Sequence, residues 1–122
     1  MTPFGARVRG LREAKGIALK QMAADLNLSS AYVSALEHGN RGRPAPGLVM
    51  QIAGYFGCIW DEAEELKRLA ELSHPRITID TAGLPPDRTE LANRLAESIR
   101  DLPDDAVADM LAVLGRVTQG NG

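Results

Sequence analysis

The chain has 122 residues, which is enough for one compact domain and a short appendage. Hydrophobic residues make up 44% and charged residues 25%, and no apolar run approaches the about 20 residues that a transmembrane helix needs. The single cysteine, Cys58, excludes an internal disulfide, and no metal-ligand spacing surrounds it. We expect a cytoplasmic protein without a membrane partner, metal, cofactor or evident small-molecule ligand.

The net charge of −2 conceals an asymmetric distribution of charge along the chain. Residues 1–57 contain seven Lys/Arg and three Asp/Glu, a net charge of +4, whereas residues 58–122 contain seven and thirteen, a net charge of −6. A basic first half and an acidic second half favour a module that faces nucleic acid, joined to a segment that does not.

The first 72 residues show a helical pattern of apolar residues, interrupted by turn signals. Pro3 suits the first turn of a helix, Gly16 suits a helix end, and Ser29 is a good N-cap for a helix that stops at Gly39. A last helix would place Trp60 on its inner side. The pattern predicts five helices, over residues 3–15, 19–26, 30–38, 46–56 and 60–72.

The pattern changes after residue 72. Residues 73–86 are rich in Pro and Gly, and Ile77 and Ile79 alternate with polar residues, which predicts a short strand or an extended arm. Apolar stripes then recur at helical spacing, which predicts helices over residues 87–101 and 103–117. We therefore divide the chain into residues 1–72, a linker or arm at 73–86, and a helical hairpin at 87–118.

Two short helices separated by a tight turn stand out in the sequence LKQMAADL-NLS-SAYVSALEHG. Ala23 is small enough for the close approach of two steeply crossing helices, and Val33 and Leu36 would anchor the second helix. The outer side of that second helix is mostly small residues. This arrangement would project the helix from the surface, toward a groove about 12 Å wide.

These residues resemble the Cro/C1-type helix-turn-helix of the lambda-repressor-like, or Xre, group of bacterial regulators. The resemblance covers about residues 6–62 and rests on a set of residue pairs and single residues: Leu11-Arg12, Lys15-Gly16, Met22-Ala23, Leu26, Ser29, Tyr32-Val33-Ser34, Leu36-Glu37, Gly39, Arg43-Pro44 and Ile52-Ala53. It implies an all-α fold with a five-helix DNA-binding domain and no enzymatic activity. It also implies a homodimeric transcriptional regulator, a repressor in our interpretation, that binds a palindromic operator in double-stranded DNA.

The resemblance also implies roles for particular residues. The residues facing base edges would be Ser30, Ala31, Tyr32, Ser34 and Ala35. The residues at the phosphate backbone would be Leu19, Lys20, Ser29, Asn40, Arg41 and Arg43. Arg12 and Glu37 would form a structural ion pair. Independently of the resemblance, His38 ends the expected helix and would favour its C-terminal dipole.

Two departures from the family pattern affect DNA recognition. Ala18 and Leu19 replace the usual hydroxyl N-cap and glutamine, so Lys20 or a backbone amide must supply the phosphate contact there. The outer side of residues 30–38 also lacks Gln, Arg and Asn, which removes every bidentate base reader. We expect operator shape to contribute more than usual to recognition.

The C-terminal segment has too little core to bury its apolar stripes alone. Either it packs back on the first domain, or it dimerises, which we favour. The residues of the expected dimer interface are Ile77, Ile79, Leu91, Leu95, Ile99, Val107, Leu111 and Leu114. The alternative function is an antitoxin-like module whose C-terminal segment binds another protein, with DNA binding for autoregulation.

Overall fold

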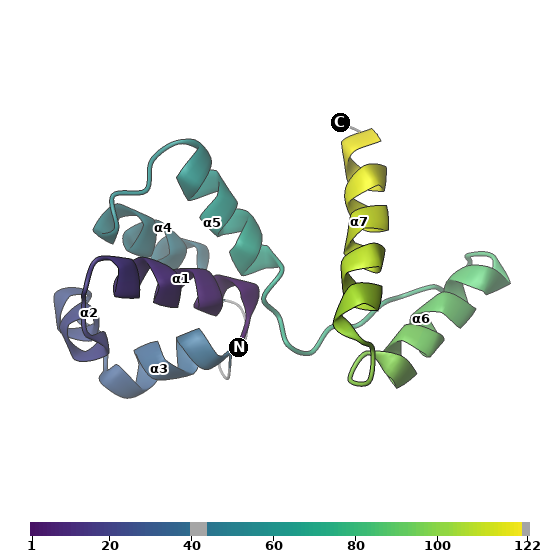
Figure 1. Cartoon of the computed structure of the whole chain (residues 1–122), viewed down its shortest axis with the longest axis horizontal. Coiled ribbons are helices and arrows are strands. Elements are labelled where there is room, and N and C mark those ends of the chain that lie inside the picture. The colour runs from purple at the N-terminus through teal and green to yellow at the C-terminus, as the bar shows by residue number, and fades with distance from the viewer. Residues whose placement is uncertain (40–43, 121–122) are drawn as a thin grey trace. The chain divides into compact units, whose positions relative to one another are not determined.

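The computed structural model describes residues 1–39 and 44–120, with side chains described as far as Thr118. The chain divides into two compact units, Met1–Ile77 and Thr78–Gly122. Every regular element in the described ranges is a helix, so the predicted all-α fold is confirmed (Figure 1). No helix in these ranges is long and apolar enough to cross a membrane.

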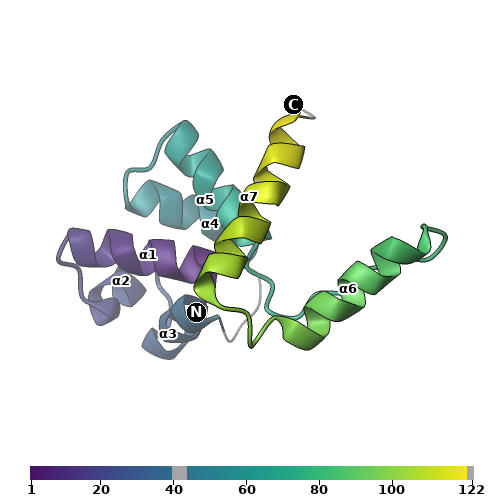
Figure 2. The ribbon, with the colours of Figure 1, turned by 45° about the vertical axis from the view of Figure 1, so that its right-hand side comes forward.

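Five helices form the first unit: α1 (Pro3–Ala14), α2 (Leu19–Asp25), α3 (Ser30–His38), α4 (Pro46–Tyr55) and α5 (Asp61–Glu71). Their bounds lie within one residue of those predicted from the sequence at every end. The Thr2 side chain caps α1 by accepting a hydrogen bond from the Gly5 N–H at 3.0 Å, and Gly16 follows α1 with a φ of +67°. Helix α1 lies between α3 and α5 (Figures 1 and 2).

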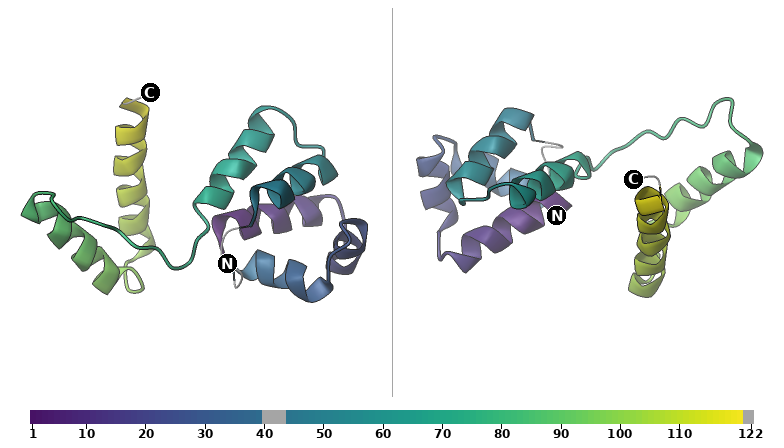
Figure 3. Two further views of the ribbon diagram at one scale, coloured as in Figure 1. Left: turned by 180° about the vertical axis from the view of Figure 1, so that it is seen from behind. Right: turned by 90° about the horizontal axis from the view of Figure 1, so that it is seen from above.

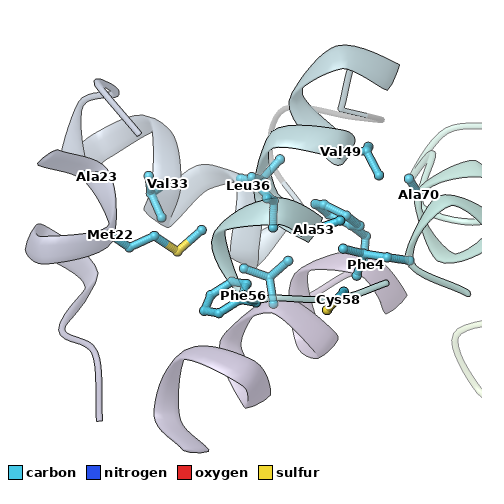
Figure 4. Packing of buried hydrophobic residues seen from close by; sticks show 13 residues of the cluster. Phe4, Met22, Ala23, Val33, Leu36, Val49, Ala53, Phe56, Cys58 and Ala70 are labelled. Atoms are coloured by element: carbon cyan, nitrogen blue, oxygen red, sulfur yellow. The ribbon is translucent and has the colours of Figure 1, made fainter. Parts of the chain in front are cut away.

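The core of this unit joins all five helices. Phe4 and Val8 of α1, Met22 of α2, Val33 of α3 and Ile52 of α4 are fully buried. Figure 4 shows Met22 and Val33 beside each other at one end of the core, with Phe4 and Ala70 at the other. Because α3 contributes residues to this shared core, its position is fixed by packing from one side.

The expectation that Trp60 faces inward is wrong. Helix α5 begins one residue later, at Asp61, so Trp60 lies outside the helical repeat and is 83% exposed. Its φ of +50° turns the chain into the helix. Leu66 and Ala70 are the buried residues of α5, and Ala63 and Leu69 pack partly against the core.

The second unit contains α6 (Pro86–Ser98) and α7 (Asp104–Gly120). The segment at residues 77–81 has no regular secondary structure, so the strand that its alternating pattern allowed is not formed (Figure 3). None of the described side chains of this unit is buried. Leu91 of α6 is 68% exposed, and Leu111 and Leu114 of α7 are each 63% exposed. The apolar stripes predicted from the sequence are therefore present, and this unit by itself leaves them largely uncovered.

Candidate nucleic-acid interface

A tight turn fixes the angle between α2 and α3. Asn27 adopts a left-handed conformation with a φ of +56°, and the Leu28 N–H returns to the Ala23 carbonyl oxygen at 2.8 Å. The Ser29 hydroxyl then accepts the Tyr32 N–H at 3.0 Å, which caps the start of α3. Ala23 is 2% exposed, which is consistent with a small residue at the helix crossing. The turn thus sends α3 away from α2 at a defined angle.

Helix α3 has a buried side and an accessible side. Val33, Leu36 and Glu37 are buried against the domain. The five predicted base-facing residues all keep accessible surface: Ser30 and Ala31 are exposed, and Tyr32, Ser34 and Ala35 are partly exposed. The structure therefore gathers these five residues on the side of α3 that the core does not occupy.

A buried ion pair connects α3 to α1. Arg12 donates from Nε to Glu37 Oε2 at 3.0 Å and from Nη2 to Glu37 Oε1 at 3.2 Å. Its Nη1 also donates to the Ile17 carbonyl oxygen at 3.0 Å. The hydrogen bond with Glu37 raises the pKa of the Arg12 guanidinium, although desolvation opposes the shift. The expected structural ion pair is present, and it has bidentate geometry.

Glycine allows α1 to approach α3 closely. A Cβ atom at Gly5 would collide with the Glu37 backbone, lying 2.7 Å from its carbonyl carbon. At the end of α3, Gly39 has a φ of +81°, and a Cβ atom there would collide with the Thr2 methyl group. The C-terminal half of α3 is therefore held by direct backbone packing as well as by the ion pair.

Helix α2 is held by a small polar network. Asp25 accepts hydrogen bonds from Gln21 at 2.7 Å and from the Tyr55 hydroxyl of α4 at 2.6 Å. The hydrogen bond to Asp25 is the main cause that raises the pKa of Tyr55, with a smaller contribution from burial. This network was not predicted from the sequence, because the two residues that link α2 and α4 are thirty positions apart.

The residues predicted to contact phosphate differ in how exposed their side chains are. Lys20 and Ser29 are exposed, whereas Leu19 packs partly against the core and could contribute only its backbone N–H. Ala18 makes no side-chain cap for α2, as its sequence predicts. Asn40, Arg41 and Arg43 lie outside the described residues.

Ser73 is a structural residue that sequence reasoning assigned to the linker. Its buried hydroxyl accepts the Phe4 N–H at 2.9 Å and donates to the Leu69 carbonyl oxygen at 2.5 Å. It thereby ties the end of α5 to the start of α1. Nothing in the local sequence indicates this contact, because Phe4 and Ser73 are 69 residues apart.

A short helix, a tight turn and a second helix with one accessible side define a helix-turn-helix protein. Residues 3–66 match the family described as "Helix-turn-helix domain". Because this match covers more than half of the 122 residues, the chain belongs to that family. The family agrees with the Cro/C1-type, or Xre, resemblance noted in the sequence.

Two curated proteins of Bacillus subtilis (strain 168) are similar to a part of the chain. One is described as "Uncharacterized HTH-type transcriptional regulator RghRB" and is 40% identical over 53 residues, which are 43% of this chain and 38% of that protein. The other, "HTH-type transcriptional repressor RghR", is 36% identical over 53 residues, which are 43% and 39%. The match thus spans about two fifths of the length of each relative. No solved structure is significantly similar to the chain.

Proposed function

We propose that the protein binds double-stranded DNA sequence-specifically as a homodimer and represses transcription by occupying its operator. The observation that carries the proposal is the two-sided character of α3. One side is buried and tied to α1 through Arg12 and Glu37, while the other is accessible and built mainly from small residues. The family match and the names of the two relatives support DNA-binding regulation.

The small outer side of α3 suits close approach to the base edges of the major groove. The Ser30 and Ser34 hydroxyls could donate to or accept from several bases, and Ala31 and Ala35 could contact a thymine methyl group. Tyr32 would lie beside them. Lys20 and the backbone at Leu19 and Ser29 would meet phosphate, as would Asn40, Arg41 and Arg43.

The second unit supports the homodimer. On α7, Met110, Leu111, Val113, Leu114 and Val117 share one broad side of the helix, and each is 43–63% exposed. The stripe formed by Leu91 of α6 and Ile99, the residue that caps the end of α6, is narrower. A second copy of the unit would cover these faces, as a single copy buries none of them. Two recognition helices would then meet a palindromic operator about 34 Å apart.

Selection from a random duplex library tests the function directly. We expect the full chain to enrich a palindromic site, and Ser34→Ala to change the preferred bases at one position in each half-site. Lys20→Ala should instead weaken binding to all sequences alike. Leu111→Glu should disrupt the dimer, so that the variant enriches single half-sites and no longer the full palindrome. The matched control is Ala108→Glu, which changes an exposed residue on the other side of α7.

The library experiment has two informative negative results. Selection without any enriched sequence would contradict sequence-specific binding. A chain that stays monomeric in analytical ultracentrifugation and enriches only single half-sites would contradict the homodimer. In that case the apolar faces of α6 and α7 would belong to a contact with a different protein, as in the antitoxin-like alternative.

A further inference from the structure

The arm at residues 76–80, between α5 and α6, is exposed along its whole length. Its sequence is Arg-Ile-Thr-Ile-Asp, and Ile77 and Ile79 are 69% and 55% exposed. No described residue makes a hydrogen bond to the backbone of residues 77–79. Backbone N–H and C=O groups need partners, and in a segment rich in β-branched residues a second strand supplies them most readily. The arm therefore has the composition and the free backbone groups of a strand that lacks its neighbour.

The arm has defined ends. Pro75 precedes it and has no N–H to donate. At the other end, Asp80 Oδ1 accepts the Ala82 N–H at 2.9 Å, and the Leu84 N–H donates to the Thr81 carbonyl oxygen at 3.1 Å, so the chain turns there. The five residues between these points match the usual length of a short strand.

The arm is complementary to itself about Thr78. When a second copy runs antiparallel with Thr78 opposite Thr78, Arg76 lies opposite Asp80 of the other copy, and Ile77 lies opposite Ile79. Oppositely charged pairs and Thr–Thr pairs are among the cross-strand pairs that stabilise antiparallel strands. Neither Arg76 nor Asp80 belongs to an ion pair among the described residues, so both charges are available.

Other registers lose these pairs. A parallel, in-register arrangement would place Arg76 opposite Arg76 and Asp80 opposite Asp80, which is unfavourable. A shift by one residue would place Ile77 opposite Asp80. In the register centred on Thr78, the four isoleucines of the two arms share one face of the ribbon, and the charged pairs share the other with Thr78.

The backbone of the arm fits the same register. The Arg76 N–H already donates to His74 Nδ1 at 3.3 Å. The ladder hydrogen bonds would therefore come from Ile77 and Ile79, whose N–H and C=O groups have no partner among the described residues. In an antiparallel pair this places Thr78 at a non-hydrogen-bonded position, where opposing Cα atoms are about 4.5 Å apart.

We infer that the arms of two copies pair as an antiparallel ribbon centred on Thr78, with Arg76 of each copy paired with Asp80 of the other. This inference rests on the homodimer of the proposed function, because two strands alone are only marginally stable. Contact through α6 and α7 would hold the arms at a high effective concentration. The inference adds Arg76, Thr78 and Asp80 to the dimer interface and fixes its register. The strand that the sequence pattern allows would then form only in the dimer.

Charge reversal tests the pairing, with the dimer dissociation constant of the full chain measured by analytical ultracentrifugation. Arg76→Asp places like charges opposite each other twice per dimer and should raise this constant about 10–30-fold, and so should Asp80→Arg. The double variant Arg76→Asp/Asp80→Arg should regain the wild-type value, and a mixture of the two single variants should form heterodimers. Arg68→Asp makes the same change in charge on the exposed surface of α5 and should have no effect.

Disulfide formation tests the register. The lone buried cysteine is first removed by Cys58→Ser. In that background Thr78→Cys should form a covalent dimer in oxidised glutathione, because its opposing Cα atoms lie within disulfide range. Thr81→Cys is the matched control: the two copies of residue 81 would be six residues apart along the ribbon, about 20 Å, and should cross-link far more slowly. Circular dichroism of each variant would check that the helices are folded.

The outcomes separate the inference from the proposed function. A chain that dimerises, but whose dissociation constant is unchanged by Arg76→Asp, would overturn the ribbon and leave the homodimer standing. Equal cross-linking rates for Thr78→Cys and Thr81→Cys would overturn it as well. A loss in Arg76→Asp that the double variant does not recover would also count against the pairing with Asp80. A wild-type chain that stays monomeric at every concentration would refute the proposed homodimer itself, and the ribbon with it.

Discussion

Replacing Arg12 by methionine should strongly destabilise the first unit. The Glu37 side chain is 2% exposed and the Arg12 side chain 13%, so the substitution leaves a buried carboxylate without its two charge-assisted hydrogen bonds. Breaking such a pair typically costs about 3–5 kcal/mol. The residual exposure of Arg12 places the expected loss near the lower end, about 3 kcal/mol. A unit of this size has a total stability of only about 4–12 kcal/mol.

Thermal unfolding followed by circular dichroism measures this loss. About 3 kcal/mol corresponds to a fall in Tm of about 12–24 °C for a domain of this length. Arg9→Met removes the exposed Arg9–Glu13 pair from the same helix and should cost less than about 1 kcal/mol. The double variant Arg12→Met/Glu37→Met should recover most of the stability, because no buried charge remains. Equal losses for Arg12→Met and Arg9→Met would refute the reasoning.

Two further predictions concern the contacts that hold α2 and α3. Gly5→Ala should lower the free energy of unfolding by about 1–3 kcal/mol, because its Cβ meets the Glu37 backbone. Gly10→Ala is the control: its Cβ has open space, so it should stabilise α1 by about 0.5–1 kcal/mol. Equal urea midpoints for the two variants would contradict the close contact at Gly5. The raised pKa of Tyr55 predicts that its contribution to stability is complete below about pH 10 and is lost as the pH rises through the raised value. In urea unfolding at increasing alkaline pH, Tyr55→Phe should therefore lose less stability than the wild type. Parallel curves of stability against pH for the two proteins would count against this prediction.

The local elements of the first unit could be predicted from the sequence because their signals are local. Ser29 caps α3, Asn27 takes the left-handed turn, and Gly39 ends the helix in a left-handed conformation, each at the expected position. These residues act on backbone atoms within a few positions of themselves, so one sequence contains the required information. The all-α fold follows from the same signals and from the helical spacing of the apolar residues.

The contacts that join distant segments could not be read in the same way. Ser73 accepts the Phe4 N–H across the whole length of the domain, and Tyr55 reaches Asp25 from another helix. Periodicity also failed at Trp60, because a helix that starts one residue later removes its first position from the repeat. The Arg12–Glu37 pair was found only through the family resemblance, since its spacing of 25 residues has no local signature.

The way in which α3 is held bears on how the protein would recognise DNA. Its outer side lacks a bidentate base reader, so a single Ser34 or Ser30 contact supplies little discrimination. The ion pair at Glu37 and the glycine contact at Gly5 hold α3 firmly against α1, so it cannot easily adjust to a poorly matching groove. A rigid helix favours operators whose groove already has the right width. In the proposed homodimer this preference would apply once in each half-site, so the ratio of affinities for well-matched and poorly matched operators would be squared. We therefore expect sequence dependence to extend to base pairs between the half-sites that the protein does not touch, and selection data confined to contacted positions would argue against this.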